Sequence, residues 1–190
     1  GLVSSCLSSA SSAPGVLFSC PQQDGDLLSA VGLTISVTVR DLSGNPVPNI
    51  SAADIWLIGC GNHLQLCGGS GAIRAAAPTD ANGQTTITGR FAASGCDTGV
   101  FVVVQGIVIG LGCPGSPGCL SLAVRSPDLI GPGGGSPDLS VTLLDLAKFG
   151  ENYPSPPSAY YACVDFVAPF GSVTLLDFAT FGRHFSHTCF

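Results

Sequence analysis

The sequence predicts a mainly β protein, an antiparallel β-sandwich followed by a small C-terminal pair of short helices. Short segments that alternate apolar and polar residues recur between positions 33 and 125, and turn-forming residues separate them. No helical periodicity lies between these segments, which favours antiparallel sheets packed in two layers. Two nearly identical segments, 140–150 and 172–182, have instead the apolar spacing of a short helix.

The strands are expected in the following order. Residues 33–40 alternate with period two, as a half-buried strand does. Residues 41–48 are rich in turn formers, and Asn82-Gly83 is a dipeptide suited to positive φ. The further expected strands are 54–58, a weaker one at 72–76, 84–91, a strand or strand pair at 100–109, and 121–125. We therefore place the sandwich at residues 23–125.

Residues 1–22 form a Ser- and Ala-rich segment with more large apolar side chains than a linker needs. These side chains are Leu2, Val3, Leu7, Val16, Leu17 and Phe18. A strand added to the sheet edge of a neighbouring molecule would bury such residues. We therefore expect these six residues to be covered by another copy of the chain.

The runs VTVRDLSGNPVPNI, PTDANGQTTITG and VFVVVQG resemble bacterial immunoglobulin-like domains of extracellular proteins. In that pattern a strand leads into a D-x-x-G-x-P-V turn, and a T-D-x-x-G-x turn leads into a later strand. The resemblance covers about half of the chain. It implies that the sandwich is immunoglobulin-like.

The C-terminal segment, 126–190, contains an internal duplication. SVTLLDLAKFG and SVTLLDFATFG match at nine of eleven positions and start 32 residues apart. In each copy a threonine stands three residues before an aspartate, a variant of the capping box. Gly150 and Gly182 are the expected C-caps. The expected buried faces are Leu143, Leu146 and Phe149 in one copy and Leu175, Phe178 and Phe181 in the other.

This repeat resembles dockerin-type modules, the duplicated calcium-loop-plus-helix domains of secreted bacterial proteins. There the last aspartate of V-x-L-x-D ligates calcium and starts the helix, a role that the resemblance assigns to Asp145 and Asp177. Asp138 falls on an upstream ligand position, whereas Asp165 lies one residue too early, and apolar residues occupy most other ligand positions. The resemblance thus implies degenerate calcium loops with Asp138, Asp145, Asp165 and Asp177 as ligands, in a chain that requires no cofactor.

Nine cysteines in 190 residues indicate an oxidising compartment, so we expect an extracellular or cell-surface protein. The absence of methionine is typical of a processed chain that has lost its signal peptide. An odd count leaves one thiol unpaired or shared with another chain. Among the many connectivities that the sequence allows, we predict Cys113–Cys119, Cys60–Cys67, Cys163–Cys189 and Cys20–Cys96, with Cys6 left over.

Composition excludes several classes of protein. The chain is 45% hydrophobic but only 9% charged, with a net charge of −6, against about 25% charged residues in ordinary soluble domains. Its mean hydropathy is +0.48. The longest apolar run, 100–111, is shorter than the roughly 20 residues of a membrane span. The acidic balance with scattered arginines disfavours nucleic acid, and the low charge disfavours disorder.

Few motifs indicate chemistry. His184 and His187 near Cys189 suggest a zinc site, but zinc needs about four ligands and Cys189 is expected in a disulfide. The glycine-rich run at 110–115 precedes no helix, and the chain has a single glutamate and no nucleophile-elbow motif, so we expect no enzyme. Asn49 begins an N-glycosylation triplet.

These observations leave two functions. The favoured one is a structural subunit that polymerises through its N-terminal segment into an extracellular fibre, because a head-to-tail contact that does not close forms filaments. The alternative is a calcium-dependent anchoring module for a cohesin-like receptor. A glycan partner has less support, because the chain is only 7% aromatic with one tryptophan.

Overall fold

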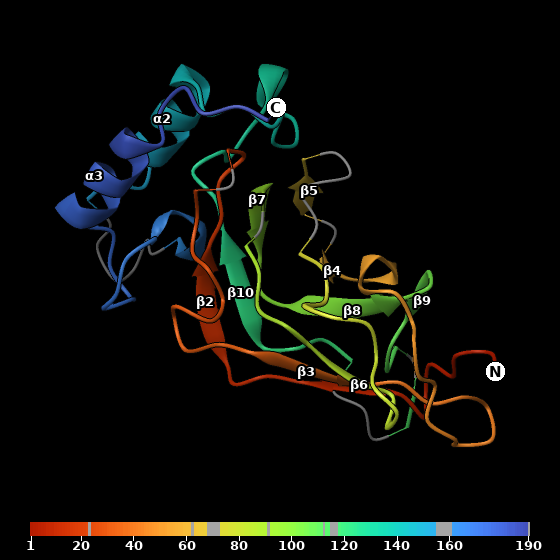
Figure 1. Cartoon of the computed structure of the whole chain (residues 1–190). Helices are drawn as coiled ribbons and strands as arrows, with labels where there is room; N and C mark the ends of the chain where they lie inside the picture. The colour runs from red at the N-terminus through yellow and green to blue at the C-terminus, as the bar shows by residue number, and fades with distance from the viewer. Residues whose placement is uncertain are drawn as a thin grey trace.

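The computed structural model describes residues 1–22, 24–61, 63–67, 73–90, 92–111, 113–114, 118–154 and 161–189. Over these residues the chain is mainly β, with two short α-helices at its C-terminal end (Figure 1). The predicted fold class is therefore confirmed. No described helix has the length and apolar character that crossing a bilayer requires.

Two of the sheets are purely antiparallel. One contains β1 (Ser9–Ser11), β3 (Ile35–Thr38) and β6 (Gln84–Ile87) in the order β1-β3-β6. The other contains β4 (Ile55–Gly59), β8 (Val100–Val104) and β9 (Ile107–Val108) in the order β4-β8-β9. All of these neighbours are antiparallel, as an immunoglobulin-like sandwich requires.

The third sheet has the order β2-β10-β7-β5, formed by β2 (Gly15–Phe18), β10 (Leu122–Arg125), β7 (Ala93–Asp97) and β5 (Leu64–Leu66). Its pair of β2 and β10 is parallel, which departs from the purely antiparallel expectation. The short 3-10 helix η1 (Ala52–Asp54) leads into β4. A single core joins the sheets, with Ile35, Ile55, Val102 and Leu122 among its buried residues.

The alternating segments of the sequence became strands with shortened ends: β3, β4, β6, the β8–β9 pair and β10 lie within the predicted ranges or one residue beyond them. The weak strand expected at 72–76 is reduced to isolated bridges at Arg74 and Ala75, and Ala72 lies outside the described residues. Four strands were not predicted, namely β1, β2, β5 and β7. Their small and polar residues, such as ASGCD in β7, lack the alternation on which the prediction depended.

The N-terminal segment is part of the sandwich, which corrects the boundary predicted after residue 22. β1 pairs with β3, and β2 lies beside β10 with Leu17 opposite Val124. Val3, Leu17 and Phe18 are buried within the chain itself, so a second copy cannot cover them without displacing these contacts. Val16 is half-buried, while Leu2 and Leu7 remain exposed.

The duplicated segment folds as predicted into α2 (Leu143–Gly150) and α3 (Leu175–Arg183). Both helices begin with the expected capping box, formed by Thr142 with Asp145 and by Thr174 with Asp177. A second hydrophobic cluster lies between the helices and β2. Its buried residues are Phe18, Cys20, Val141, Phe149, Val164, Phe166, Val173 and Phe181. Two 3-10 helices, η2 (Pro132–Gly134) and η4 (Ala162–Val164), lie in the loops before α2 and α3.

Two details of the helix prediction are wrong. Leu143 and Leu175 are each 70% exposed, and Phe178 is 45% exposed, although all three were predicted to be buried. The aspartate that caps each helix points inward, so the buried residues are Asp145 and Phe149 in α2 and Asp177, Thr180 and Phe181 in α3. Gly150 and Gly182 are not left-handed C-caps. Both lie inside their helices, and neither has a positive φ.

The disulfides also differ from those predicted. The structure contains Cys6–Cys113, Cys60–Cys119, Cys67–Cys189 and Cys96–Cys163, and leaves Cys20 as the free, buried cysteine. The prediction paired cysteines close in sequence, whereas these bonds join segments separated by 59 to 122 residues. Two of them bind the helical segment to the sandwich. Four disulfides indicate an oxidising compartment.

Candidate metal centre

Four side chains with metal-binding atoms converge where the N-terminal segment meets the C-terminal helices. They are Cys20, Asp24, His184 and His187, and one ligand atom of each lies within 4.8 Å of the others. Among the residues that the structure describes, this is the only such set of three or more. Cys189, the cysteine that follows the two histidines in the sequence, is bonded to Cys67 and does not belong to the set.

The first two residues are held by a tight loop after β2. The backbone N–H of Ser19 donates to the carbonyl of Arg125 at 2.8 Å, which extends the pairing of β2 with β10 by one residue. The loop then returns to the strand: Asp26 N–H donates to Phe18 O at 2.8 Å, and Phe18 N–H donates to Asp26 Oδ2 at 3.0 Å. These bonds fix the backbone on both sides of Cys20 and Asp24.

The two histidines are held by the end of α3. His184 is the C-cap residue, and its N–H donates to Phe181 O at 3.0 Å. The chain then turns at Ser186, whose φ is 67°, and pairs with Val141. Ser186 N–H donates to Val141 O at 2.9 Å, and Val141 N–H donates to His187 O at 2.8 Å. The backbone carrying both imidazoles is thus tied to the start of the helical segment.

The atoms of the cluster are close enough to share one ligand. Cys20 Sγ lies 3.2 Å from His187 Nδ1. Asp24 Oδ2 lies 3.1 Å from His184 Nδ1 and 3.3 Å from His187 Nδ1. Cys20 is fully buried and His184 is 8% exposed, whereas the Asp24 side chain is 42% exposed. The cluster is therefore buried on the side of Cys20 and His184 and reaches solvent at Asp24 and, to a smaller extent, at His187.

Burial and mutual charge shift three of these groups. Burial raises the pKa of the Cys20 thiol well above its usual range, and the Asp24 charge adds to this effect. Burial also lowers the pKa of His184, although the nearby Asp24 carboxylate opposes that change. Partial burial opposes ionisation of Asp24, but contact with Cys20 and the charges of the two histidines outweigh it and lower its pKa. These shifts favour the neutral forms of Cys20 and His184 and the ionised form of Asp24.

The arrangement is unlike a nucleophilic triad. In such a triad the nucleophile and the acid use opposite nitrogens of one imidazole. Here the Cys20 thiol and the Asp24 carboxylate both face the same atom, His187 Nδ1. Several lone pairs directed at one point are instead the arrangement of a metal-binding site.

The aspartates assigned to calcium by the dockerin resemblance bind backbone N–H groups. Asp145 Oδ1 accepts from the N–H groups of Leu129 at 2.6 Å and Ile130 at 2.9 Å. Asp177 Oδ1 accepts equivalently from Phe166 at 2.6 Å and Val167 at 2.9 Å. The second oxygen of each caps its own helix. These carboxylates thus join each helix to the loop before it.

The other two proposed calcium ligands differ in burial. Asp165 is buried, accepts from Gly171 N–H at 2.7 Å and lies 3.8 Å from Arg125 Nη1. Asp138 is exposed. Asp128, which the sequence analysis did not select, occupies in the first repeat the position of Asp165 in the second. It is fully buried and accepts from Ser140 N–H at 2.9 Å.

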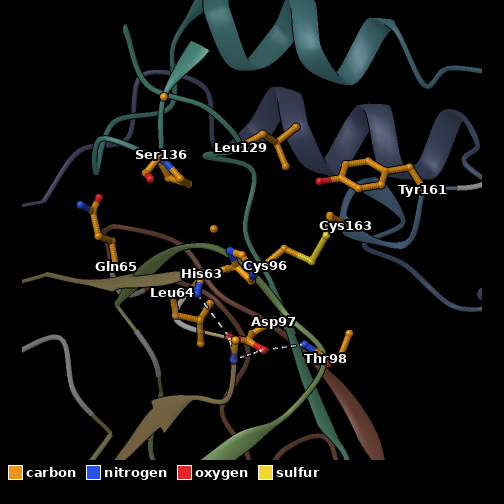
Figure 2. Close-up of a pocket in the computed structure, with 14 residues that line it drawn as sticks. His63, Leu64, Gln65, Cys96, Asp97, Thr98, Leu129, Ser136, Tyr161 and Cys163 are labelled. Carbon is orange, nitrogen blue, oxygen red and sulfur yellow. Dashed lines mark hydrogen bonds between the residues drawn. A yellow bond between two sulfur atoms is a disulfide. The ribbon is translucent and has the colours of Figure 1, made fainter. Parts of the chain in front are cut away.

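A cleft of about 720 Å³ lies between the sandwich and the helical segment (Figure 2). His63, Gln65, Ser136 and Tyr161 line it, and the Cys96–Cys163 disulfide lies along one wall. Its one carboxylate, Asp97, accepts from the N–H groups of Gly61, His63 and Thr98. That carboxylate organises loops and does not face a second acid or a nucleophile among the residues that line the cleft.

Asn49, the glycosylation candidate, is exposed and has a φ of 61°. The metal cluster itself was not predicted as a set. Its ligands are about 160 positions apart, and only their pairwise spacings, Cys-x₃-Asp and His-x₂-His, were visible in the sequence.

Comparisons with known proteins assign this chain to no family. No protein-family model and no curated protein matches the chain, so the dockerin resemblance gains no support. Among solved structures, a crystal structure of the Lin-41 filamin domain is similar at 15% sequence identity and a TM-score of 0.32. That similarity covers 63% of this chain and 95% of the filamin domain. It is too low to add to the description of the fold given above.

Proposed function

We propose that this chain is a non-enzymatic extracellular structural protein whose copies associate head to tail through exposed apolar residues at its two ends. The observation that carries the proposal is the position of these residues. The helices lie at one end of the molecule and the N-terminus at the other (Figure 1). A contact between two different ends does not close on itself, so it propagates into a filament.

At the helical end, each repeat exposes two leucines in its first turn. Leu143 and Leu175 are each 70% exposed, and Leu144 and Leu176 are 48% and 59% exposed. We call these four residues the helical patch. Because these leucines are exposed, they do not pack into the core of their own chain. Their presence at equivalent positions of both repeats therefore favours a role in contact with another molecule.

At the N-terminal end, Leu2 is 77% exposed and Leu42 is 69% exposed. Val3 and Asp41 form an antiparallel bridge, so Leu2 and Leu42 lie opposite each other on neighbouring segments. We call this pair the N-terminal patch. Of the six residues predicted to mediate assembly, this patch includes Leu2. The Cys6–Cys113 disulfide and the pairing of β2 with β10 hold the N-terminal segment in its own chain, so the proposed contact joins two folded surfaces and exchanges no strand.

Low charge supports association as well. Only 9% of the residues are charged, which leaves little electrostatic repulsion between copies. We expect light scattering and sedimentation to show a mass that increases with protein concentration. Leu143→Gln/Leu175→Gln and Leu2→Gln/Leu42→Gln should each remove this increase, whereas Val31→Gln, at an exposed site outside both patches, should leave it unchanged.

Mixing the two double variants tests the head-to-tail geometry. Each retains one intact end, so an equimolar mixture should form 1:1 dimers although neither variant associates alone. A wild-type chain that stays monomeric at millimolar concentration would overturn the proposal. The alternative, in which the helical patch docks onto a different receptor protein, is favoured by the equivalent leucines in both repeats and predicts that monomeric result.

A further inference from the structure

We infer that Cys20, Asp24, His184 and His187 bind one Zn²⁺ ion, which fastens the end of β2 to the C-terminal turn after α3. The inference is independent of self-association. It rests on the distances between the four ligand atoms, on a buried nitrogen that lacks a well-formed hydrogen bond and on the chemistry of the donor set.

The distances fit a tetrahedral ion. Zinc binds sulfur at about 2.3 Å and imidazole nitrogen or carboxylate oxygen at about 2.0–2.2 Å, which places neighbouring ligand atoms roughly 3.3–3.7 Å apart. Of the six separations among the four ligand atoms, three are a few tenths of an ångström shorter: 3.2 Å from Cys20 to His187, and 3.1 and 3.3 Å from Asp24 to the two histidines. The other three lie within 4.8 Å. A small outward movement of the side chains therefore completes the site.

A buried imidazole nitrogen faces this point without a hydrogen bond. His184 is more than nine-tenths buried, and its Nδ1 makes no well-formed hydrogen bond among the described residues, although Asp24 Oδ2 lies 3.1 Å away as an ion-pair partner. An unsatisfied buried polar atom is unfavourable by about 1–3 kcal/mol and is therefore rare in native proteins. Coordination to a cation satisfies this lone pair.

The donor set indicates which cation. One thiolate and two imidazoles are soft or borderline ligands, which exclude calcium and magnesium, and a carboxylate as fourth ligand completes the closed four-coordinate shell of a structural zinc site. Cys20 supplies the thiolate because it is the only described cysteine outside a disulfide. On binding, the thiol proton is released to solvent and a sulfur–zinc bond forms, with no change of oxidation state.

The site joins parts of the chain that no disulfide joins directly. Cys20 and Asp24 follow β2, whereas His184 and His187 follow α3, and Phe18 packs against His184 with their ring centroids 4.8 Å apart. The nearest covalent bond is Cys67–Cys189, two residues beyond His187. Zinc therefore adds a link from the N-terminal strand to the helical segment, which should stabilise the C-terminal turn most.

Cobalt titration of the full oxidised chain, freed of metal by a chelator and kept without reductant, tests the inference. We expect one equivalent of Co²⁺ to give the absorption of a tetrahedral site with a thiolate-to-metal charge-transfer band, and Zn²⁺ to displace it. Cys20→Ser should remove that band. His187→Gln should weaken binding by at least tenfold, whereas His63→Gln, at the exposed histidine elsewhere in the chain, should not affect it.

Thermal unfolding provides a second measurement, because Cys20 is buried and its variant can lose the fold. Zn²⁺ should raise the melting temperature of the wild type and of His63→Gln, but not that of His187→Gln or Asp24→Asn, whose changed side chains are at least partly exposed. Absence of stoichiometric binding would overturn the inference. So would a cobalt spectrum without the thiolate band, or equal weakening by His63→Gln, because either result would mean binding elsewhere.

Discussion

Leu17 and Phe18 are consecutive in the sequence, yet each belongs to a different hydrophobic cluster. Leu17 is fully buried in the sandwich core, whereas Phe18 is buried against the helical segment and contacts Phe166 with ring centroids 5.5 Å apart. The reason is the strand geometry of β2, in which successive side chains point to opposite faces. One short strand thus supports both parts of the molecule.

Alanine substitution at these two positions should therefore affect different parts of the chain. Each change removes a buried side chain, and we expect each to lower the free energy of unfolding by about 3 kcal/mol. Trp56 in β4 reports on the sandwich, while the tyrosines, which all belong to residues 126–190 of the sequence, report on the helical segment. Leu17→Ala should shift the tryptophan transition and Phe18→Ala chiefly the tyrosine transition. Identical shifts of both signals in both variants would contradict this division.

Asp177→Asn should destabilise the helical segment by about 3 kcal/mol, because hydrogen bonds to a charged acceptor contribute about 1.5–3 kcal/mol each. The carboxylate accepts from the N–H groups of Phe166, Val167 and Thr174, and an amide cannot accept all of them. Chemical denaturation followed by tyrosine fluorescence measures the loss. Asp138→Asn, at an exposed position, is the matched control and should change stability by less than about 0.5 kcal/mol.

Removal of calcium tests whether the Asp177 carboxylate binds the metal or only backbone N–H groups. If its main role is to bind backbone N–H groups, a chelator such as EGTA should leave the unfolding transition of the helical segment unchanged. A stability that increases with calcium in the wild type but not in Asp177→Asn would mean that the resemblance to calcium loops describes this residue better.

The sequence predicted the elements whose pattern is local. The period-two segment around Ile35 became β3, and the threonine–aspartate spacing at Thr174 became a capping box. Features that depend on contacts between distant segments were not predictable. The Cys6–Cys113 bond spans 107 positions, and Cys20 meets His187 across 167 positions. No local pattern encodes such contacts, since they depend on how the strands pair.

Stability should fall as the pH rises from about 4 to about 6, because of Asp128. Burial, with the charges of Asp145 and Asp138, raises the pKa of Asp128 from 3.8 to about 6, although the Ser94 hydroxyl and the Ser140 N–H partly oppose the change. A carboxyl whose pKa is higher in the folded state favours folding when protonated. Its contribution is therefore complete below pH 4 and is lost above pH 6, a change of about 3 kcal/mol.

Asp128→Asn isolates this contribution, since an amide keeps an acceptor for Ser140 N–H and does not ionise. Subtracting the variant's pH profile from that of the wild type cancels the other titrating groups. We expect the variant to be more stable than the wild type at pH 7 and the difference to shrink toward pH 4. A difference that is constant with pH would show that Asp128 has an ordinary pKa.

Gly25→Ala should lower stability by about 2 kcal/mol, typical of an overpacked site. A β-carbon at this position would lie 2.5 Å from Phe18 O and 2.8 Å from Ser19 Cα, so the loop that carries Asp24 would have to move away from β2. Thermal unfolding measures the loss of stability. If the change proves neutral, the loop does not require this close approach.

Gly182→Ala should stabilise the chain by roughly 0.5–1 kcal/mol, the usual advantage of alanine over glycine inside a helix. A β-carbon at position 182 meets no atom within 4 Å, and the residue lies within α3 without a positive φ. Had Gly182 been the left-handed C-cap that its place at the end of the repeat suggested, alanine would instead be unfavourable. Gly83→Ala supplies the contrast, because Gly83 has a φ of 74° and close backbone neighbours, so alanine should destabilise there. Calorimetric melting of the two variants should therefore move in opposite directions from the wild type, and a decrease for both would restore the C-cap assignment.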